Sequence, residues 1–122
     1  MSIFRVAVVE DDESFREALE GLFQTVGHEV LLYISGEDFM QSGRLADVGC
    51  LITDFGLPGM NGIDLLRAAH AVRPDLPVIM ITSSPEPSIL SRALAAGAHR
   101  VFTKPLDSSE LLKAVTAAKQ PQ

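Results

Sequence analysis

Several residues capable of chemistry stand directly after short apolar runs of this sequence. The run at residues 6–9 leads into four consecutive carboxylates at 10–13, and a later run ends in Asp54. Two further runs end in Thr82 and in Lys104. Carboxylates are ligands for Mg²⁺ and can also act as nucleophiles. Together with a hydroxyl and an ammonium group, they are suited to phosphoryl transfer.

Asp11 and Asp54 are expected to lie a few Å apart if their runs form neighbouring strands. Two like charges at that distance repel by about 4 kcal/mol at an effective dielectric constant of about 20. Either one carboxyl group stays protonated or a divalent cation balances the pair. With Mg²⁺ bound, Asp54 is expected to attack a phosphoryl group, Lys104 to neutralise its oxygens, and Thr82 to donate a hydrogen bond.

The elements that must position these residues are predicted from the apolar pattern. Continuous runs of Val, Ile and Leu are typical of strands covered on both faces, as in a parallel sheet. Such runs predict strands at 3–9, 30–33, 50–53, 78–82 and 101–103. Between them, helical periodicity predicts helices over 15–26, from Ser35, over 63–72, over 89–94 and over 111–115, the last entered through Asp107 or Ser108.

Strand and helix therefore alternate five times, which predicts an α/β fold with a doubly wound parallel sheet and right-handed crossovers. In such sheets ligands bind outside the carboxyl ends of the strands. The chemical residues stand at those ends. With 122 residues and no repeat or internal linker, a single domain is expected.

Composition narrows the function classes. The chain has 10 Lys and Arg residues against 16 Asp and Glu residues, a net charge of −6, and no basic cluster. Direct binding to nucleic acid or to an anionic membrane is therefore not expected. No run approaches the ~20 apolar residues of a membrane span, so a cytoplasmic protein is expected. The single cysteine, Cys50, is interpreted as a small core residue.

Each chemical residue also has an ordinary structural interpretation. Asp12 or Glu13 can cap the following helix, and we expect one of them to do so. Thr82 could bond to backbone, and Lys104 could be a solvated surface charge. Four such coincidences at one edge of one sheet are improbable, which favours the functional interpretation.

Taken together, these segments resemble the receiver domain of bacterial two-component response regulators. The resemblance extends from Val6 to Leu112 and rests on residues 8–12, 53–62, 79–83, 96–98 and 103–106. It implies a flavodoxin-like (βα)5 sandwich with strand order 2-1-3-4-5. It also implies a receiver domain over residues 1–119, followed by a tail or linker stub at 120–122.

The resemblance implies a role for each residue of the acidic site. Asp54 is similar to the phosphoacceptor, which receives its phosphoryl group from a phosphohistidine on a sensor histidine kinase or a histidine phosphotransfer protein. Asp11 and Asp54 resemble the Mg²⁺ ligands, with Gly56 offering its backbone carbonyl. Glu10 resembles the acidic neighbour that acts on the metal through water.

The resemblance also implies a switch. Thr82 is similar to the hydroxyl that moves toward the phosphoryl group, and Lys104 to the lysine that contacts it. The Lys104–Pro105 bond resembles a cis peptide bond of the family. The family usually has an aromatic residue three positions before the lysine, but here that position is Val101 and Phe102 follows it. The switch is therefore expected to involve Val101, or Phe102 in a shifted role.

The function implied is a non-enzymatic signalling module with Mg²⁺-dependent self-phosphorylation and autodephosphorylation chemistry. Phosphorylation is expected to change the surface of the fourth helix, fifth strand and fifth helix. That surface would act on a downstream effector domain or protein, or form a homodimer. A stand-alone receiver and the amino-terminal part of a longer regulator are both compatible with the sequence.

Other function classes are disfavoured by particular residues. A small aspartate-nucleophile phosphohydrolase would have a second acid two residues after the nucleophile, where this chain has Gly56, and a cap domain. A phosphorylation-independent binding scaffold would not need all the residues of the phosphorylation site, which this chain has. A flavodoxin-like cofactor binder would need a phosphate-cradling loop where this chain has four acids.

Overall fold

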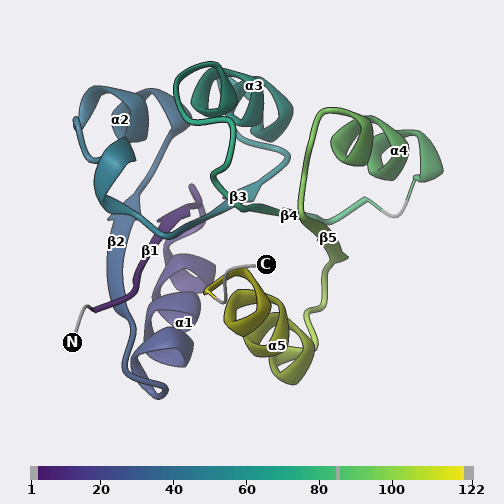
Figure 1. Ribbon diagram of the computed structural model, residues 1–122. Helices are drawn as coiled ribbons and strands as arrows, with labels where there is room; N and C mark the ends of the chain where they lie inside the picture. The colour runs from purple at the N-terminus through teal and green to yellow at the C-terminus, as the bar shows by residue number, and fades with distance from the viewer. Residues whose placement is uncertain (1–2, 85, 120–122) are drawn as a thin grey trace.

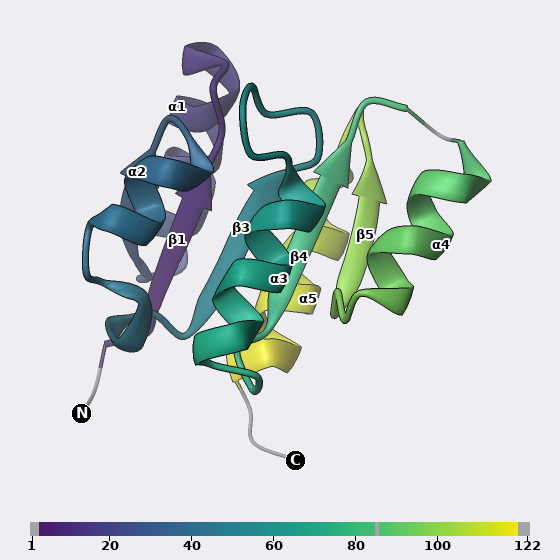
Figure 2. The same cartoon turned by 90° about the horizontal axis from the view of Figure 1, so that it is seen from above.

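The computed structural model describes residues 3–84 and 86–119, so the predicted tail at 120–122 lies outside the described residues. Its centre is a five-stranded sheet of order β2-β1-β3-β4-β5 (Figure 1), in which every neighbouring pair is parallel. Figure 2 shows β1, β3, β4 and β5 side by side and running in the same direction. The strands are β1 (Arg5–Val9), β2 (Glu29–Tyr33), β3 (Cys50–Asp54), β4 (Val78–Thr82) and β5 (Arg100–Thr103). The predicted fold class and strand order are confirmed.

Helices cover both faces of the sheet. They are α1 (Glu13–Gln24), α2 (Gly36–Gln41), α3 (Gly62–Val72), α4 (Pro87–Ala95) and α5 (Ser108–Lys119), with a short 3-10 turn, η1 (Leu45–Asp47). Helices α1 and α5 lie on one face, and α2, α3 and α4 lie on the other (Figure 1). Among the described residues, no helix combines the length and the apolar character needed to cross a bilayer.

Polar residues at the helix starts explain where the helices begin. Asp12 accepts hydrogen bonds from the backbone of Ser14 and Phe15, which confirms the predicted cap of α1. Ser35 caps α2, as predicted, and of the two candidates for the start of α5, Asp107 and Ser108, Asp107 accepts the capping hydrogen bond. These side-chain oxygens accept from N–H groups that have no partner within the helix.

Alternating strand residues build two cores, one on each face of the sheet. In β4, Val78 and Met80 face α2, α3 and α4, whereas Ile79 and Ile81 face α1 and α5. Cys50 is fully buried on the second face, and burial raises the pKa of its thiol to about 12. Cys50 is therefore the core residue that the sequence predicted.

The apolar periodicity overestimates the buried stripe of three helices. Val26 lies beyond the end of α1 and is 50% exposed, Val72 ends α3 and is 67% exposed, and Leu94, in the last turn of α4, is 55% exposed. An apolar residue in a last turn can continue the period without facing the sheet. The strand predicted at 3–9 begins only at Arg5.

Parallel pairing brings the predicted chemical residues to one edge. Val9 pairs with Thr53, so the carboxylates that follow β1 lie beside Asp54 at the end of β3. Thr82 pairs with Thr103, so the end of β4 lies beside Lys104. The strand order β1-β3-β4-β5 thus places four strand ends in a row.

Gly62 allows the loop after β3 to fold back tightly onto the strand. Its N–H donates to the carbonyl of Phe55 at 2.9 Å. A Cβ atom at this position would lie 2.6 Å from the backbone oxygen of Asp54 and 2.9 Å from Cα of Phe55. Both obstacles are backbone atoms, so any side chain here would displace the acidic site.

We therefore expect Gly62→Ala to lower the free energy of unfolding by about 2 kcal/mol, because the added methyl group overpacks the loop. Gly21→Ala is the matched control, since a Cβ at Gly21 in α1 meets nothing within 4 Å. It should raise the free energy of unfolding by about 0.5–1 kcal/mol through the helix propensity of alanine. Urea denaturation followed by circular dichroism measures both, and equal effects of the two variants would contradict this role of Gly62.

Candidate metal and phosphoacceptor site

Three carboxylates converge where β1 and β3 end. One oxygen from each of Glu10, Asp11 and Asp54 lies within 4.8 Å of the other two. Glu10 is buried at 2% exposure, Asp54 is half-buried and Asp11 is exposed. The structure therefore brings together the three acids that the sequence singled out.

Lys104 reaches into this acidic cluster from the end of β5. Its Nζ lies 3.4 Å from Oε1 of Glu10 and 3.4 Å from Oδ1 of Asp54. The backbone N–H of Lys104 donates to the carbonyl of Thr82 at 2.8 Å, and the following bond to Pro105 is cis. Lys104 is thus no solvated surface charge, and the cis bond implied by the resemblance is present.

The Asp54 carboxylate has few partners for its charge. Burial raises the pKa of Asp54, the charge of Asp11 raises it further, and Lys104 opposes both effects. Oδ1 is buried and, among the described residues, has no hydrogen-bond partner of suitable geometry, although Lys104 lies at ion-pair distance. An incompletely satisfied buried carboxylate oxygen is a natural ligand for a cation.

Glu10 is held more firmly than Asp54. Burial raises the pKa of Glu10, whereas the hydrogen bond from the backbone N–H of Asp12, at 3.0 Å, lowers it. Arg16 in α1 donates to the backbone carbonyl of Glu10 at 2.8 Å. Burial disfavours the ammonium form of Lys104, but the charges of Asp54 and Glu10 outweigh this and raise its pKa.

Gly56 lies next to the Asp54 carboxylate. A Cβ atom at Gly56 would be 3.6 Å from Oδ2 of Asp54, so the loop backbone runs within reach of the site. Farther along the loop, the N–H of Met60 donates to Oε2 of Glu37 at 3.0 Å. The loop that carries Gly56 is thereby tied to the start of α2.

The Thr82 hydroxyl is bonded to its own loop. It accepts a hydrogen bond from the N–H of Ser84 at 3.0 Å and donates to the Ser84 carbonyl at 3.3 Å. Thr82 is 2% exposed. The hydroxyl must therefore give up its bond to the Ser84 carbonyl before it can donate to a phosphoryl group on Asp54.

Val101 and Phe102 occupy opposite faces of the sheet. Val101 packs with the core beneath α2, α3 and α4, and Phe102 packs with the core beneath α1 and α5. The guanidinium carbon of Arg100 lies 4.8 Å from the centre of the Phe102 ring. Of these two residues, Val101 therefore lies on the same side of the sheet as α4.

The residues present fit a hard divalent cation. Asp11 and Asp54 would supply carboxylate oxygens, and Glu10 stands beside them. With Lys104 included, the four side chains carry a net charge of −2. Mg²⁺ would offset that charge and supply a positive centre for phosphate oxygens.

Sequence reasoning missed four residues that shape the site. Phe15 places its ring 4.3 Å from Nζ of Lys104, and Arg16 bonds to Glu10. Asn61 and Asp64 form a reciprocal capping box that starts α3. The spacing of Asn61 and Asp64 resembles a capping-box pattern and was a usable signal, whereas the contacts of Phe15 and Arg16 depend on tertiary structure.

Comparison with known proteins identifies the family. Residues 6–116 match the response regulator receiver domain, and the chain belongs to this family. It is 37% identical over 115 residues to Nodulation protein W of Bradyrhizobium diazoefficiens and 32% identical over 113 residues to Transcriptional regulatory protein FixJ of Azorhizobium caulinodans. The resemblance inferred from the sequence is thus confirmed.

The matched relatives are longer than this chain. The two alignments cover 94% and 93% of this chain but 51% and 54% of the relatives, so the chain spans about half their length. Among solved structures, a BeF3-activated DrrB receiver domain is 26% identical with a TM-score of 0.89, covering 96% of this chain and 97% of that one. The similarity to that receiver therefore extends over nearly the whole fold.

Asp54→Asn should stabilise the metal-free protein. The raised pKa of Asp54 means that its charged form is less favourable in the folded than in the unfolded state, so a neutral amide should raise the free energy of unfolding by about 1 kcal/mol. Saturating Mg²⁺ should remove this advantage, because the wild type gains the binding energy of the ion. Urea denaturation in a chelator and in Mg²⁺ measures both effects.

Asp75→Asn provides the control, since the Asp75 side chain is 83% exposed and its pair with Arg73 is long, at 3.7 Å. It should change stability by less than about 0.5 kcal/mol in either condition. A metal-free Asp54→Asn protein less stable than the wild type would contradict the electrostatic description of this site.

Proposed function

We propose that Asp54 accepts a phosphoryl group from a phosphohistidine of a sensor histidine kinase or a histidine phosphotransfer protein. The observation that carries this proposal is the convergence of Asp54 with two further carboxylates and Lys104 in a chain of the receiver family. Asp11, Asp54 and the backbone carbonyl of Gly56 would hold Mg²⁺ directly, and Glu10 would act through water.

The transfer step follows from the chemistry of the side chains. A carboxylate oxygen of Asp54 attacks phosphorus in line with the departing imidazole, the N–P bond breaks, and an acyl phosphate forms. The imidazole nitrogen keeps the bond's electron pair and takes up a proton. Lys104, already 3.4 Å from Asp54, neutralises charge on the phosphoryl oxygens. Autodephosphorylation is the attack of water on the same phosphorus, which restores Asp54 and releases inorganic phosphate.

The switch would begin at Thr82. When its hydroxyl donates to a phosphoryl oxygen, its bond to the Ser84 carbonyl breaks and the segment leading to α4 loses part of its anchor. Because the Thr82 carbonyl also accepts from Lys104, the ends of β4 and β5 are coupled. Val101 packs on the side of the sheet that carries α4, so it can shift together with α4. Phe102 packs on the side that carries α5 and would transmit a change to α5 instead. The expected output surface is α4, β5 and α5.

The partners downstream are proposed from the relatives. FixJ is described as a transcriptional regulatory protein, and this chain corresponds to about half of its length. We infer that the receiver controls an effector in the same chain or in another protein, with homodimer formation on phosphorylation as one means. No direct contact of the receiver with nucleic acid or membrane is proposed, and a cytoplasmic location suits a phosphohistidine donor.

A phosphohydrolase or a phosphorylation-independent scaffold is less well supported. Gly56 offers no second acid beside Asp54 to activate a substrate leaving group. A scaffold would not require the buried Glu10 carboxylate or the Lys104 ammonium group beside Asp54. The family assignment also favours the signalling function over both alternatives.

Incubation with a small acyl phosphate or amido phosphate in Mg²⁺ should add one phosphoryl group to the wild-type chain, detected as a mass increase of the intact protein. Asp54→Asn should abolish the increase because it removes the nucleophile, and a chelator should have the same effect. Asp75→Asn should leave the uptake unchanged.

Two results would count against this function. Undiminished uptake in Asp54→Asn would place the acceptor elsewhere. Continuous consumption of donor without any accumulated phosphoprotein would favour a phosphohydrolase, because a signalling receiver must retain its phosphoryl group long enough to be read.

A further inference from the structure

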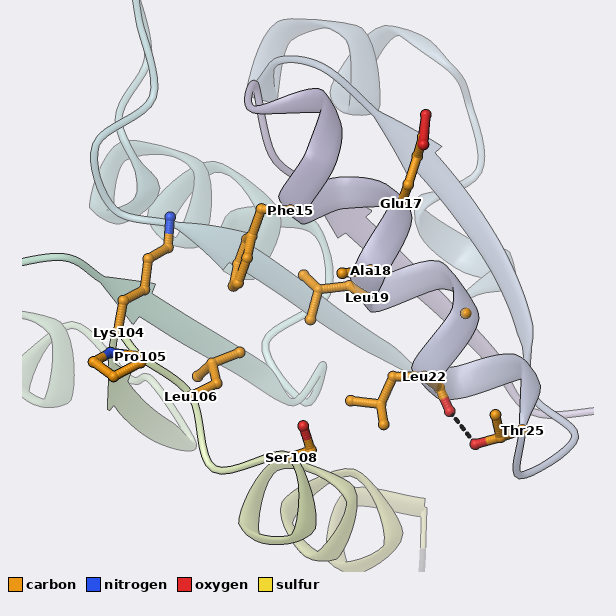
Figure 3. A pocket seen from close by; sticks show the side chains of 11 residues that line it. Phe15, Glu17, Ala18, Leu19, Leu22, Thr25, Lys104, Pro105, Leu106 and Ser108 are labelled. Carbon is orange, nitrogen blue, oxygen red and sulfur yellow. Dashed lines mark hydrogen bonds between the residues drawn. The ribbon is translucent and has the colours of Figure 1, made fainter.

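A groove of about 650 Å³ runs between α1 and the segment that joins β5 to α5 (Figure 3). Its walls are mainly apolar and include Leu22 and Leu106, and one end is formed by Phe15 and Lys104. Figure 3 shows the Phe15 ring and the Lys104 ammonium beside each other at that end. The lysine of the acidic site therefore also borders an open space on the α1 side.

We propose that Phe15 is a positioning residue for Lys104, which holds the ammonium group in the acidic cluster and keeps it out of the groove. The inference rests on the proposed function, because it assigns Phe15 a role in phosphorylation. The centre of the Phe15 ring lies 4.3 Å from Nζ, well within the ~6 Å over which an aromatic face attracts a cation.

Lys104 needs such a contact because its other restraints are loose. Lysine has a flexible four-carbon stem and makes point-charge contacts rather than a fixed fork of hydrogen bonds. Both of its carboxylate distances are 3.4 Å, longer than the 2.7–2.9 Å typical of a strong charged hydrogen bond. The side chain is also 25% exposed. Without the ring, the ammonium could turn toward solvent through the groove.

An aromatic ring is better suited to this role than an aliphatic side chain. Its face carries partial negative charge, so it attracts the ammonium while covering it from water. The attraction is also tolerant of distance. Lys104 can therefore shift by about 1 Å toward a phosphoryl group on Asp54 and remain within ~6 Å of the ring. The other groups near Nζ, Glu10 and Asp54, cannot provide this restraint once their charges are shared with a cation.

Phe15→Leu separates this role from a merely structural one because two readouts should move in opposite directions. With the ammonium less confined, phosphorylation by a small acyl phosphate should slow by about fivefold. The Mg²⁺ dissociation constant, measured by calorimetry, should fall by about twofold, because a positive charge has moved away from the carboxylates. Simple loosening of the site would weaken Mg²⁺ binding as well as phosphorylation.

Phe15→Tyr keeps the aromatic face and should restore both values to those of the wild type. Leu22→Met changes the groove without touching Lys104 and should alter neither. Unchanged values in Phe15→Leu, a loss in both readouts, or equal effects of the Leu and Tyr variants would overturn the role of Phe15. Failure of the wild type itself to take up phosphate at Asp54 would instead refute the proposed function.

Discussion

The site depends on like charges held together by the sheet. Because β1 and β3 are paired, the acids after β1 cannot move away from Asp54 without breaking strand pairing. Lys104 balances only part of the charge, and burial makes the remaining charge more costly. The folded chain therefore keeps an unfavourable cluster of negative charges, which a bound cation would stabilise before a phosphoryl group is added.

The surrounding structure serves to hold this cluster in place. Gly62 lets the loop after β3 fold back against the strand, and Glu37 ties that loop to α2. On the other side, the bond from the Lys104 N–H to the Thr82 carbonyl joins the ends of β4 and β5. A change of charge at Asp54 can thus reach the segment before α4 and the segment before α5 through contacts that already exist. This connection gives the proposed switch a physical path without requiring long-range rearrangement.

Much of this organisation was predictable from the sequence. Apolar runs of strand length alternating with helical periodicity fix the fold class, and strand ends locate Asp11, Asp54, Thr82 and Lys104. The exposed ends of the helical stripes, as at Val72, were not predictable, because periodicity does not report how far a helix extends over the sheet.

The contacts that refine the site depend on tertiary structure. The contact between the Phe15 ring and Lys104 joins residues that are far apart in the chain. In the sequence, Phe15 is one of the periodic apolar residues that predict a helix, and this periodicity indicates only that its side chain faces the core. The hydrogen-bond partner of Thr82 was also open, since a hydroxyl at a strand end can bond either to the backbone or to a ligand. In the structure it bonds to Ser84, as an ordinary strand-end hydroxyl would. Residue types therefore identify the chemistry, whereas packing determines which groups are already engaged.

The most direct test of the central claim is fluorine NMR of the protein with fluoroberyllate, an analogue of a phosphoryl group. If the carboxylate cluster can accept such a group only after a cation offsets its charge, a protein-bound fluorine signal should appear with Mg²⁺ and be absent in a chelator. It should also be absent from Asp54→Asn in Mg²⁺. A bound signal without the cation, or one that persists without the Asp54 carboxylate, would contradict the claim.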